Sequence, residues 1–258
     1  MSALDDHALA ADLAERAGHL LLTLRAGGGD RDVLRKAGDR QSHEFLAAEL
    51  ARERPDDAVL SEEGSDDQAR LDADRVWIID PLDGTNEFGD PGRSDWAVHV
   101  ALWARAAAAG TGDLIAGAVA LPAQNRVLST VAGPADAADR EAHRPLRMVV
   151  SRSRASQLVK DVAAKLNAEM VPCGSAGAKV ATVITGDNDV YLHSGGFYEW
   201  DTAAPVAVAR QRGFHVSRID GSPVLYNQKD PLLPDILVCR PAIAPVLLHA
   251  IREATHAI

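Results

Sequence analysis

Two aspartates follow an apolar segment of the sequence and are separated from each other by only two residues. The apolar segment at 77–79 is typical of a buried strand, and it leads directly into Asp80-Pro81-Leu82-Asp83. Proline has a fixed φ and no N–H, so we expect the strand ladder to stop at Pro81 and the chain to turn. Such a turn can direct two carboxylates and the Leu82 carbonyl to one point, and oxygen ligands of this kind suit Mg²⁺.

The next two residues, Gly84 and Thr85, are expected to open a turn or a helix. Free N–H groups at such a point bind anions, which would place a phosphate beside the metal. However, an Asp-Gly pair after a strand is also a common hairpin signal. Taken alone, the segment could therefore be an ordinary turn, and its significance depends on what accompanies it.

Two other junctions in the sequence carry acids. Glu62 and Glu63 follow a short apolar segment, and Asp201 precedes a run of small residues typical of a helix start. Each has a simpler interpretation, because paired acids usually lie in water and an aspartate before a helix is often its N-cap. Together with Asp80 and Asp83, however, they supply enough carboxylates for two or three divalent cations around one phosphate. Such a centre hydrolyses phosphate monoesters by activating water, without a covalent intermediate.

The composition limits the kinds of partner. The chain has 258 residues, 47% of them hydrophobic, and a net charge of −10, which argues against a nucleic acid or a membrane surface as partner. Cys173 and Cys239 form no CxxC pattern and are expected to be core thiols in a reduced compartment. The acidic N-terminus lacks the features of a signal peptide, so we expect a cytoplasmic protein. None of the nine histidines shows metal-ligand spacing, and His99 and His193 are expected to be structural.

Periodicity predicts alternating helices and strands. In the first half, we expect helices at about 5–25 and 40–52, the second with Asp39 as its N-cap, and strands at 59–60, 75–79, 96–103, 114–121 and 126–131. A polar stretch at 133–143 is expected to connect two halves, 1–145 and 146–258. In the second half, we expect strands at 146–150, 170–171, 190–192 and 236–239, with helices at 155–168, 176–184 and 203–212 and a closing helix. The economical architecture is a set of packed helix and sheet layers.

Three motifs carry a family resemblance. DPLDGT at 80–85 resembles the first signature of the inositol monophosphatase-like, lithium-sensitive phosphatases, and WDTAA at 200–204 resembles their second. The pair Glu62-Glu63 is similar to the acids that precede the first signature, and the resemblance spans nearly the whole chain. It implies an α+β fold, a layered αβαβα sandwich, two to three Mg²⁺ ions and inhibition by Li⁺. It also implies a possible homodimer.

The residues after the first signature favour one branch of the family. The ending Glu87-Phe88 is similar to the 3'(2'),5'-bisphosphate nucleotidases of the CysQ type. Two departures are Asn86, where that type usually has Lys or Arg, and Arg154, where many members have His. The segment 174–179 is also one residue longer than usual. The resemblance thus implies removal of the 3'-phosphate from adenosine 3',5'-bisphosphate (PAP), with its 5'-phosphosulfate analogue (PAPS) as a further possible substrate. The alternatives are inositol 1-phosphate or fructose 1,6-bisphosphate at the same centre, a non-catalytic phosphoester-binding protein, or a domain whose acids are only caps and turns.

The resemblance also implies roles for the acids. Glu62, Asp80 and the Leu82 carbonyl would bind the first metal, and Asp80, Asp83 and Asp201 the second, with a third, weaker ion near Glu62. The catalytic residues would be Glu62 and the pair Thr85 and Asp39, which would orient and deprotonate the attacking water, although Asp39 has the simpler interpretation of a cap.

Substrate contacts follow from the same resemblance. Gly84 and Thr85 would hold the scissile phosphate through their N–H groups, and Asp201 would also contact the substrate. A second anion site would be built around Lys179, with Ser175 at a helix N-terminus beside it. Residues of the segment after the strand at 146–150 are expected to line the same pocket: Ser151, Arg152 and Arg154.

Overall fold

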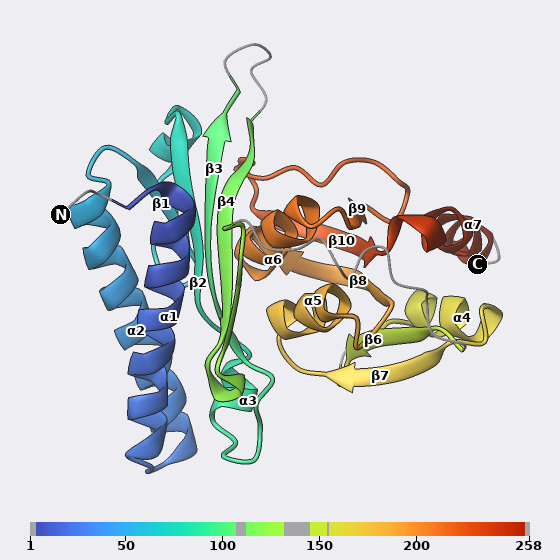
Figure 1. Ribbon diagram of the computed structural model, residues 1–258, viewed down its shortest axis with the longest axis horizontal. Helices are drawn as coiled ribbons and strands as arrows, with labels where there is room; N and C mark the ends of the chain where they lie inside the picture. The colour runs from blue at the N-terminus through green and yellow to red at the C-terminus, as the bar shows by residue number, and fades with distance from the viewer. Residues whose placement is uncertain (1–3, 107–111, 132–144, 154, 256–258) are drawn as a thin grey trace.

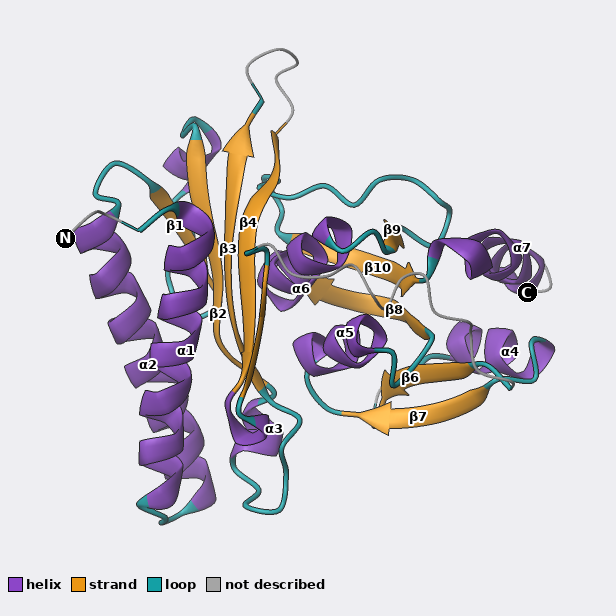
Figure 2. Cartoon of the chain, viewed as in Figure 1, coloured by secondary structure: helices purple, strands orange, loops and turns teal. Residues whose placement is uncertain are grey.

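The computed structural model describes residues 4–106, 112–131, 145–153 and 155–255. The predicted connection at 133–143 and the position of Arg154 lie outside these residues. In the described part, helices and sheets alternate in layers (Figures 1 and 2). Among the described helices, none is both long enough and apolar enough to cross a membrane.

The first sheet packs against a pair of long helices. These are α1 (Asp6–Ala26) and α2 (Arg31–Glu53), at the left in Figure 1. The sheet has the order β1-β2-β3-β4-β5, with β1 parallel to β2 and the remaining neighbours antiparallel. Its strands are β1 (Ala58–Ser61), β2 (Arg75–Asp83), β3 (Ala97–Arg105), β4 (Gly112–Leu121) and β5 (Arg126–Ser129). The strands expected at 96–103, 114–121 and 126–131 are therefore confirmed, and they follow one another as an antiparallel meander.

The second sheet has parallel and antiparallel neighbours in the order β7-β6-β8-β10-β9. Its strands are β6 (Arg147–Ser151), β7 (Glu169–Cys173), β8 (Val190–Tyr198), β9 (His215–Ser217) and β10 (Leu232–Cys239). Helices α4 (Gln157–Lys165) and α7 (Ala244–Thr255) cover its outer face, and α5 (Ala176–Thr185) and α6 (Glu199–Gln211) lie between the two sheets. This is the αβαβα sandwich that the family resemblance implied. The division at 145/146 stays a prediction.

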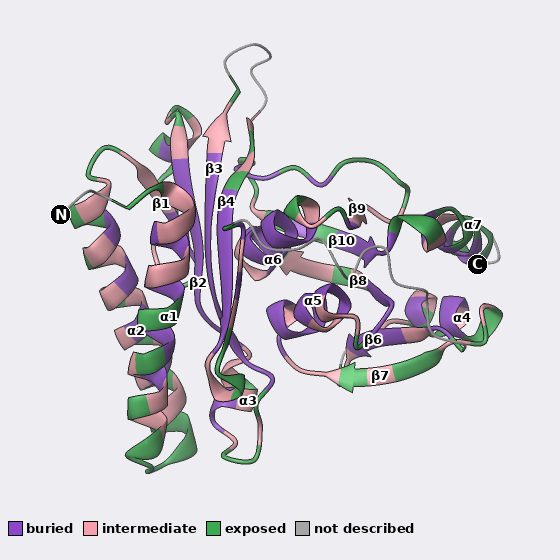
Figure 3. Ribbon diagram, in the orientation of Figure 1, coloured by how far each residue is buried: buried purple, intermediate pink, exposed green. Residues whose placement is uncertain are grey.

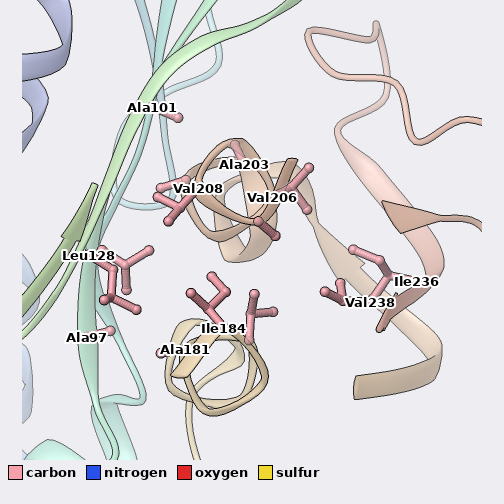
Figure 4. Close-up of a cluster of buried hydrophobic side chains, with 14 of the residues drawn as sticks. Ala97, Ala101, Leu128, Ala181, Ile184, Ala203, Val206, Val208, Ile236 and Val238 are labelled. Atoms are coloured by element: carbon pink, nitrogen blue, oxygen red, sulfur yellow. The ribbon is translucent and has the colours of Figure 1, made fainter. Parts of the chain in front are cut away.

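Three apolar clusters hold the layers together, one around the central helix layer and one beneath each outer pair of helices. The largest surrounds α5 and α6, where Ile184 and Val206 pack between β10 on one side and the first sheet on the other (Figure 4). A second joins α1 and α2 to the first sheet, and a third joins α4 and α7 to the second. Since helices cover both faces of the first sheet, most of β2 and β3 is buried (Figure 3). This explains their continuous apolar sequences.

The predicted start of the second helix was wrong. Helix α2 begins at Arg31, and its N-cap is Asp30, whose Oδ1 accepts hydrogen bonds from the N–H groups of Asp32 and Val33. Gly38 lies inside the helix, where a Cβ would come within 2.9 Å of Leu82 and 2.8 Å of Phe88. Asp39 is therefore a mid-helix residue and caps nothing. The start of α6 was also wrong, and β9 was not predicted at all.

Strand β2 does not end at the proline. Its pairing with β3 shifts between Asp80, which is opposite His99, and Asp83, which is opposite Ala97. Pro81 lies inside this irregularity, as a residue without an N–H must, and its carbonyl accepts a hydrogen bond from Ser42 Oγ at 2.7 Å. Asp80 and Asp83 therefore both lie within β2, which pairs with β3. A four-residue helix, α3 (Thr85–Phe88), follows directly.

Candidate active site

A cavity of about 440 Å³ opens where β2, α5, β8 and α6 meet. Every site residue predicted from the sequence lines it except Asp39, which contacts one of the lining residues instead, and Arg154, which is not described. The lining residues from that prediction are Glu62, Asp80, Leu82, Asp83, Gly84, Thr85, Ser151, Arg152, Ser175, Lys179 and Asp201. The structure therefore brings the predicted set together, while the individual roles stay predictions.

Asp80 is the most enclosed of the four acids in the cavity. Its side chain is 1% exposed, and Oδ1 accepts the Leu82 N–H at 3.0 Å. Oδ2 is buried and accepts no hydrogen bond from any donor among the described residues. Burial, and then the charges of Glu62 and Asp83, raise the pKa of Asp80 well above its usual range. A buried carboxylate oxygen without a donor is a suitable ligand for a divalent cation.

Glu62 and Asp201 reach the cavity from different halves of the chain. Glu62 follows β1, and Asp201 lies in the first turn of α6. Burial, followed by the charge of Asp201, raises the pKa of Glu62 to about 7. Asp201 is not the N-cap of α6, which is Tyr198. It is the third helical residue, and its Oδ2 accepts the Tyr198 N–H at 2.6 Å. A cluster of acids that repel one another at neutral pH fits one or more divalent cations.

Glu62 should make the metal-free protein less stable as the pH rises. Because its pKa is about 7 in the folded chain and 4.5 as a free group, the folded state binds its proton more tightly. The free energy of unfolding therefore falls between these two values. We expect the metal-free Glu62→Gln variant to melt a few degrees above the wild type at about pH 7.5, since about 1 kcal/mol shifts Tm by about 2–4 °C in a chain of this size.

The measurement is calorimetric melting of both proteins in chelator across this pH range. At about pH 4 the two Tm values should converge, because Glu62 is then protonated in both states. Two histidines whose pKa is lowered by burial, His99 and His215, act in the opposite sense, but they are present in both proteins. A Tm difference that stays constant with pH would contradict the raised pKa of Glu62.

Asp83 is held by the N-terminus of α5. Its Oδ2 accepts hydrogen bonds from Ser175 Oγ at 2.5 Å and from the Gly177 N–H at 2.7 Å. Both donors belong to the first turn of a helix, where unpaired N–H groups and the helix dipole favour a negative charge. Ser175 was predicted to assist a second phosphate, but its hydroxyl is directed at Asp83. The anion bound at this helix end is the protein's own carboxylate.

His99 is a site residue that the sequence prediction missed. Its ring is fully buried, with Nδ1 3.1 Å from the Trp200 carbonyl and Nε2 3.3 Å from Asp83 Oδ2. One ligating atom each from Asp80, Asp83 and His99 lie within 4.8 Å of one another. Burial lowers the pKa of His99. The signal was a single polar residue in the apolar run 96–103, on the strand that pairs with β2.

Thr85 and Asp39 meet beside the cavity, as predicted. Thr85 Oγ1 lies 3.2 Å from Asp39 Oδ1 and also 3.2 Å from the Leu82 carbonyl. Burial, and then the charge of Glu63, raise the pKa of Asp39 to about 6. A carboxylate with this pKa is largely ionised at pH 7 yet basic enough to accept a proton. The geometry therefore suits a Thr–Asp pair that acts on water.

The two described basic residues of the predicted second anion site are both engaged with the protein. Lys179 is buried, donates to the Gly174 carbonyl, and lies 5.5 Å from the centroid of the Tyr191 ring. The Arg152 guanidinium donates to Glu87 Oε1 at 3.1 Å and to Asp95 Oδ2 at 3.0 Å. Glu87 thus links α3 to the end of β6 across the mouth of the cavity.

Only one of the cysteines is a core thiol. Cys239 is buried, whereas Cys173 is half-buried and lines the cavity. Burial raises the pKa of the Cys173 thiol to about 12, so it is a poor nucleophile at neutral pH.

Comparison with known proteins agrees with this geometry. Residues 7–256 match the model of the inositol monophosphatase family. The chain is 52% identical to a 3'-phosphoadenosine 5'-phosphate phosphatase of Mycobacterium leprae (strain TN), over 97% of this chain and 94% of that protein. It is 31% identical to the 3'(2'),5'-bisphosphate nucleotidase CysQ of Escherichia coli (strain K12), over 86% and 94%. The crystal structure of CysQ from Bacteroides thetaiotaomicron superimposes with a TM-score of 0.75 at 29% identity, over 90% and 96%.

Proposed function

Since the chain belongs to the inositol monophosphatase family, a metal-dependent family, we propose that it is a Mg²⁺-dependent phosphatase that removes the 3'-phosphate from PAP to give AMP and phosphate. The observation that carries the proposal is the convergence of four acids and a Thr–Asp pair on one cavity. The 52% identity to a protein named as a PAP phosphatase supports the choice of substrate. So does Glu87, the residue by which the sequence resembles nucleotidases rather than inositol phosphatases.

The acids and one carbonyl would hold two to three Mg²⁺ ions. The proposed ligands are Glu62, Asp80, Asp83, Asp201 and the Leu82 carbonyl. When bound, the ions lower the pKa of water and offset the charge that develops on the phosphate. The hydrogen bonds from α5 keep Oδ2 of Asp83 in one place. The ligand set is therefore fixed before the substrate arrives, which reduces reorganisation during the reaction.

The Thr–Asp pair would manage the proton of the attacking water. Thr85 Oγ1 takes the proton of the water and passes its own to Asp39 Oδ1, 3.2 Å away. The pKa of about 6 lets Asp39 accept that proton near neutral pH. Gly84, in the left-handed region at φ 89°, begins the turn whose N–H groups would hold the scissile phosphate.

The second phosphate would bind at the basic side of the cavity. Lys179 and Arg152 both line it, and Glu87 and Asp95 hold the Arg152 guanidinium in a fixed orientation. A preoriented guanidinium recognises a phosphate at a lower entropic cost than a mobile one. This feature favours a bisphosphate over a monophosphate as substrate.

A panel of phosphate esters tests the proposal. With Mg²⁺, we expect phosphate release from PAP to exceed release from inositol 1-phosphate and fructose 1,6-bisphosphate at equal concentration. Lys179→Met keeps the apolar stem against Tyr191 and removes the charge, so KM for PAP should rise on the order of tenfold or more, the size of a lost charged hydrogen bond. Its KM for adenosine 3'-monophosphate, which lacks the second phosphate, should change little.

Lys165→Met on the outer helix α4 is the matched control, because Lys165 pairs with Glu253 at the surface. It should leave both KM values unchanged. Inositol 1-phosphate turning over as fast as PAP would overturn the substrate assignment. Equal effects of Lys179→Met on the bisphosphate and the monophosphate would remove Lys179 from the second phosphate site.

The remaining expectations concern the cellular compartment, a further substrate, inhibition by Li⁺ and the oligomeric state. Both described cysteines are free, which supports a reducing compartment, and we assign the protein to the cytoplasm. Use of PAPS, inhibition by Li⁺ and a homodimer stay predictions.

A further inference from the structure

Arg70 is a charged residue buried at a distance from the cavity. Its side chain is 1% exposed and lies in a short 3-10 helix, Gln68–Leu71. Two of its nitrogens contact the Asp66 carboxylate, at 2.6 and 3.1 Å. The other hydrogen bonds go to the far half of the chain, to Asn227 Oδ1 at 2.6 Å and the Gln228 carbonyl at 2.8 Å. A buried guanidinium is retained only when its donors are satisfied in this way.

The same two residues of the far half hold the first residue of α6. The N–H groups of Asn227 and Gln228 donate to the two oxygens of Glu199, at 2.6 and 2.8 Å. Asn227 has φ 58°, a left-handed conformation that asparagine tolerates better than most residues. Glu199 is itself 1% exposed. Arg70, Asn227 and Glu199 thus form one buried chain of contacts.

The ends of this chain of contacts are close in sequence to two of the proposed metal ligands. Asp66 and Arg70 belong to the segment that follows Glu62, and Glu199 precedes Asp201 by two residues in the first turn of α6. Asp80 and Asp83 share one strand, so the fold of that strand fixes their spacing. Glu62 and Asp201 come from different halves of the chain, and their spacing has to be set by contacts between the halves.

We propose that Arg70 is a positioning residue, which together with Asn227 and Glu199 sets the separation of Glu62 and Asp201 and thereby the metal affinity of the centre. The inference rests on the metal centre proposed above. Arg70 touches no reacting group. It acts by joining the loop that carries one ligand to the helix that carries the other.

Direct metal binding tests this role. In Asn227→Gly the backbone keeps its left-handed conformation, while the hydrogen bond from Arg70 to the side chain is lost. In Arg70→Lys the guanidinium hydrogen bonds to Asp66 and Asn227 are lost. Calorimetric titration of each metal-free variant with Mg²⁺ and Mn²⁺ should show a Kd raised on the order of tenfold or more, as when the groups behind metal ligands are removed. At saturating metal, kcat should remain within about twofold of the wild type, because every ligand is still present.

Arg105→Lys is the matched control. Arg105 donates to the carbonyls of Leu71 and Ala73, at 2.8 and 3.0 Å, so it braces the same segment as Arg70. Among the described residues, Arg105 makes no hydrogen bond or ion pair with α6 or the 226–228 loop. The control should lower Tm and leave the metal Kd unchanged. This separates a loss of stability from a loss of ligand positioning.

Each outcome has one interpretation. Wild-type Kd values in both Asn227→Gly and Arg70→Lys, or an equal rise in Arg105→Lys, would overturn the role of Arg70. If Arg70→Lys fails to fold, Asn227→Gly decides, since its backbone conformation is the one glycine adopts freely. A wild-type protein that binds neither Mg²⁺ nor Mn²⁺ would instead overturn the proposed metal centre.

Discussion

Asp83→Asn should lose Mg²⁺-dependent phosphate release on the order of 10³-fold, the upper end of the range for removing one group from a preorganised electrostatic centre. The hydrogen bonds around Asp83 explain why so small a change is severe. Ser175 Oγ and the Gly177 N–H both donate to Oδ2. An asparagine must turn its carbonyl toward these two donors. Its NH₂ group is then left facing the other acids, where it cannot bind a cation.

The loss should not come from unfolding. The charge of Asp83 adds to the electrostatic repulsion that raises the pKa of Glu62 and Asp80. Removing this charge therefore lowers the repulsion in the metal-free protein. We expect the Tm of Asp83→Asn in chelator to be equal to or above that of the wild type. Phosphate release from PAP and melting in chelator are the two measurements. Asp12→Asn, at an exposed surface pair with Arg16, is the control and should retain full activity. An Asp83→Asn enzyme with undiminished turnover would contradict the mechanism.

Gly177→Ala should disable the same site by steric means. A Cβ at this position would come 2.0 Å from His99 Nε2 and within 3.0 Å of two other ring atoms. The ring is fully buried and its Nδ1 contacts the Trp200 carbonyl, so it cannot move aside freely. Overpacking of this kind costs about 1–3 kcal/mol. The start of α5 must shift, and the Gly177 N–H then moves away from Asp83.

We expect a lowered Tm together with at least a tenfold weaker metal affinity, the range found when a hydrogen bond behind a metal ligand is lost. Melting and calorimetric titration with Mg²⁺ measure the two effects. Gly92→Ala is the control, because its Cβ would meet nothing nearer than Asp90 Oδ1 at 3.7 Å. The double variant with His99→Ser removes the ring and should recover part of the lost Tm. If Gly177→Ala matched the wild type in both measurements, the close contact with His99 would affect neither stability nor metal binding, and the prediction would be wrong.

The acids that line the cavity could be predicted from sequence because the pattern that indicates them is local. Asp80 and Asp83 follow an apolar strand at a fixed spacing, and any fold that keeps the strand keeps them together. The layered sandwich could be predicted from the family resemblance, and most elements from their periodicity. These are properties of neighbouring residues.

The misplaced elements depend on contacts between distant residues. Gly38 is a helix breaker by propensity, but its role is to let α2 approach Leu82 and Phe88. That contact cannot be read from the sequence around Gly38. The predicted helix began nine residues late, and Asp39 was given a capping role that Asp30 performs.

The partners of the supporting residues could not be predicted for the same reason. Ser175 was given the task that a helix N-terminus performs most often, binding a ligand's anion. Its partner in the structure is Asp83, which is 92 residues away in the chain. His99 joins the site only because β3 pairs with β2 in a register that puts it opposite Asp80. This register of β3 against β2 cannot be read from the sequence.

The buried acid cluster has a consequence for the lifetime of the protein in the cell. Without cations, folding must bring mutually repelling carboxyl groups out of water, which weakens the native state. A cation that binds only the folded chain stabilises it by mass action, increasingly so as its concentration exceeds Kd. With Mg²⁺ as the proposed ion, the unfolded fraction exposed to proteases would rise when magnesium is scarce. Magnesium supply would therefore set the abundance of this phosphatase as well as its rate.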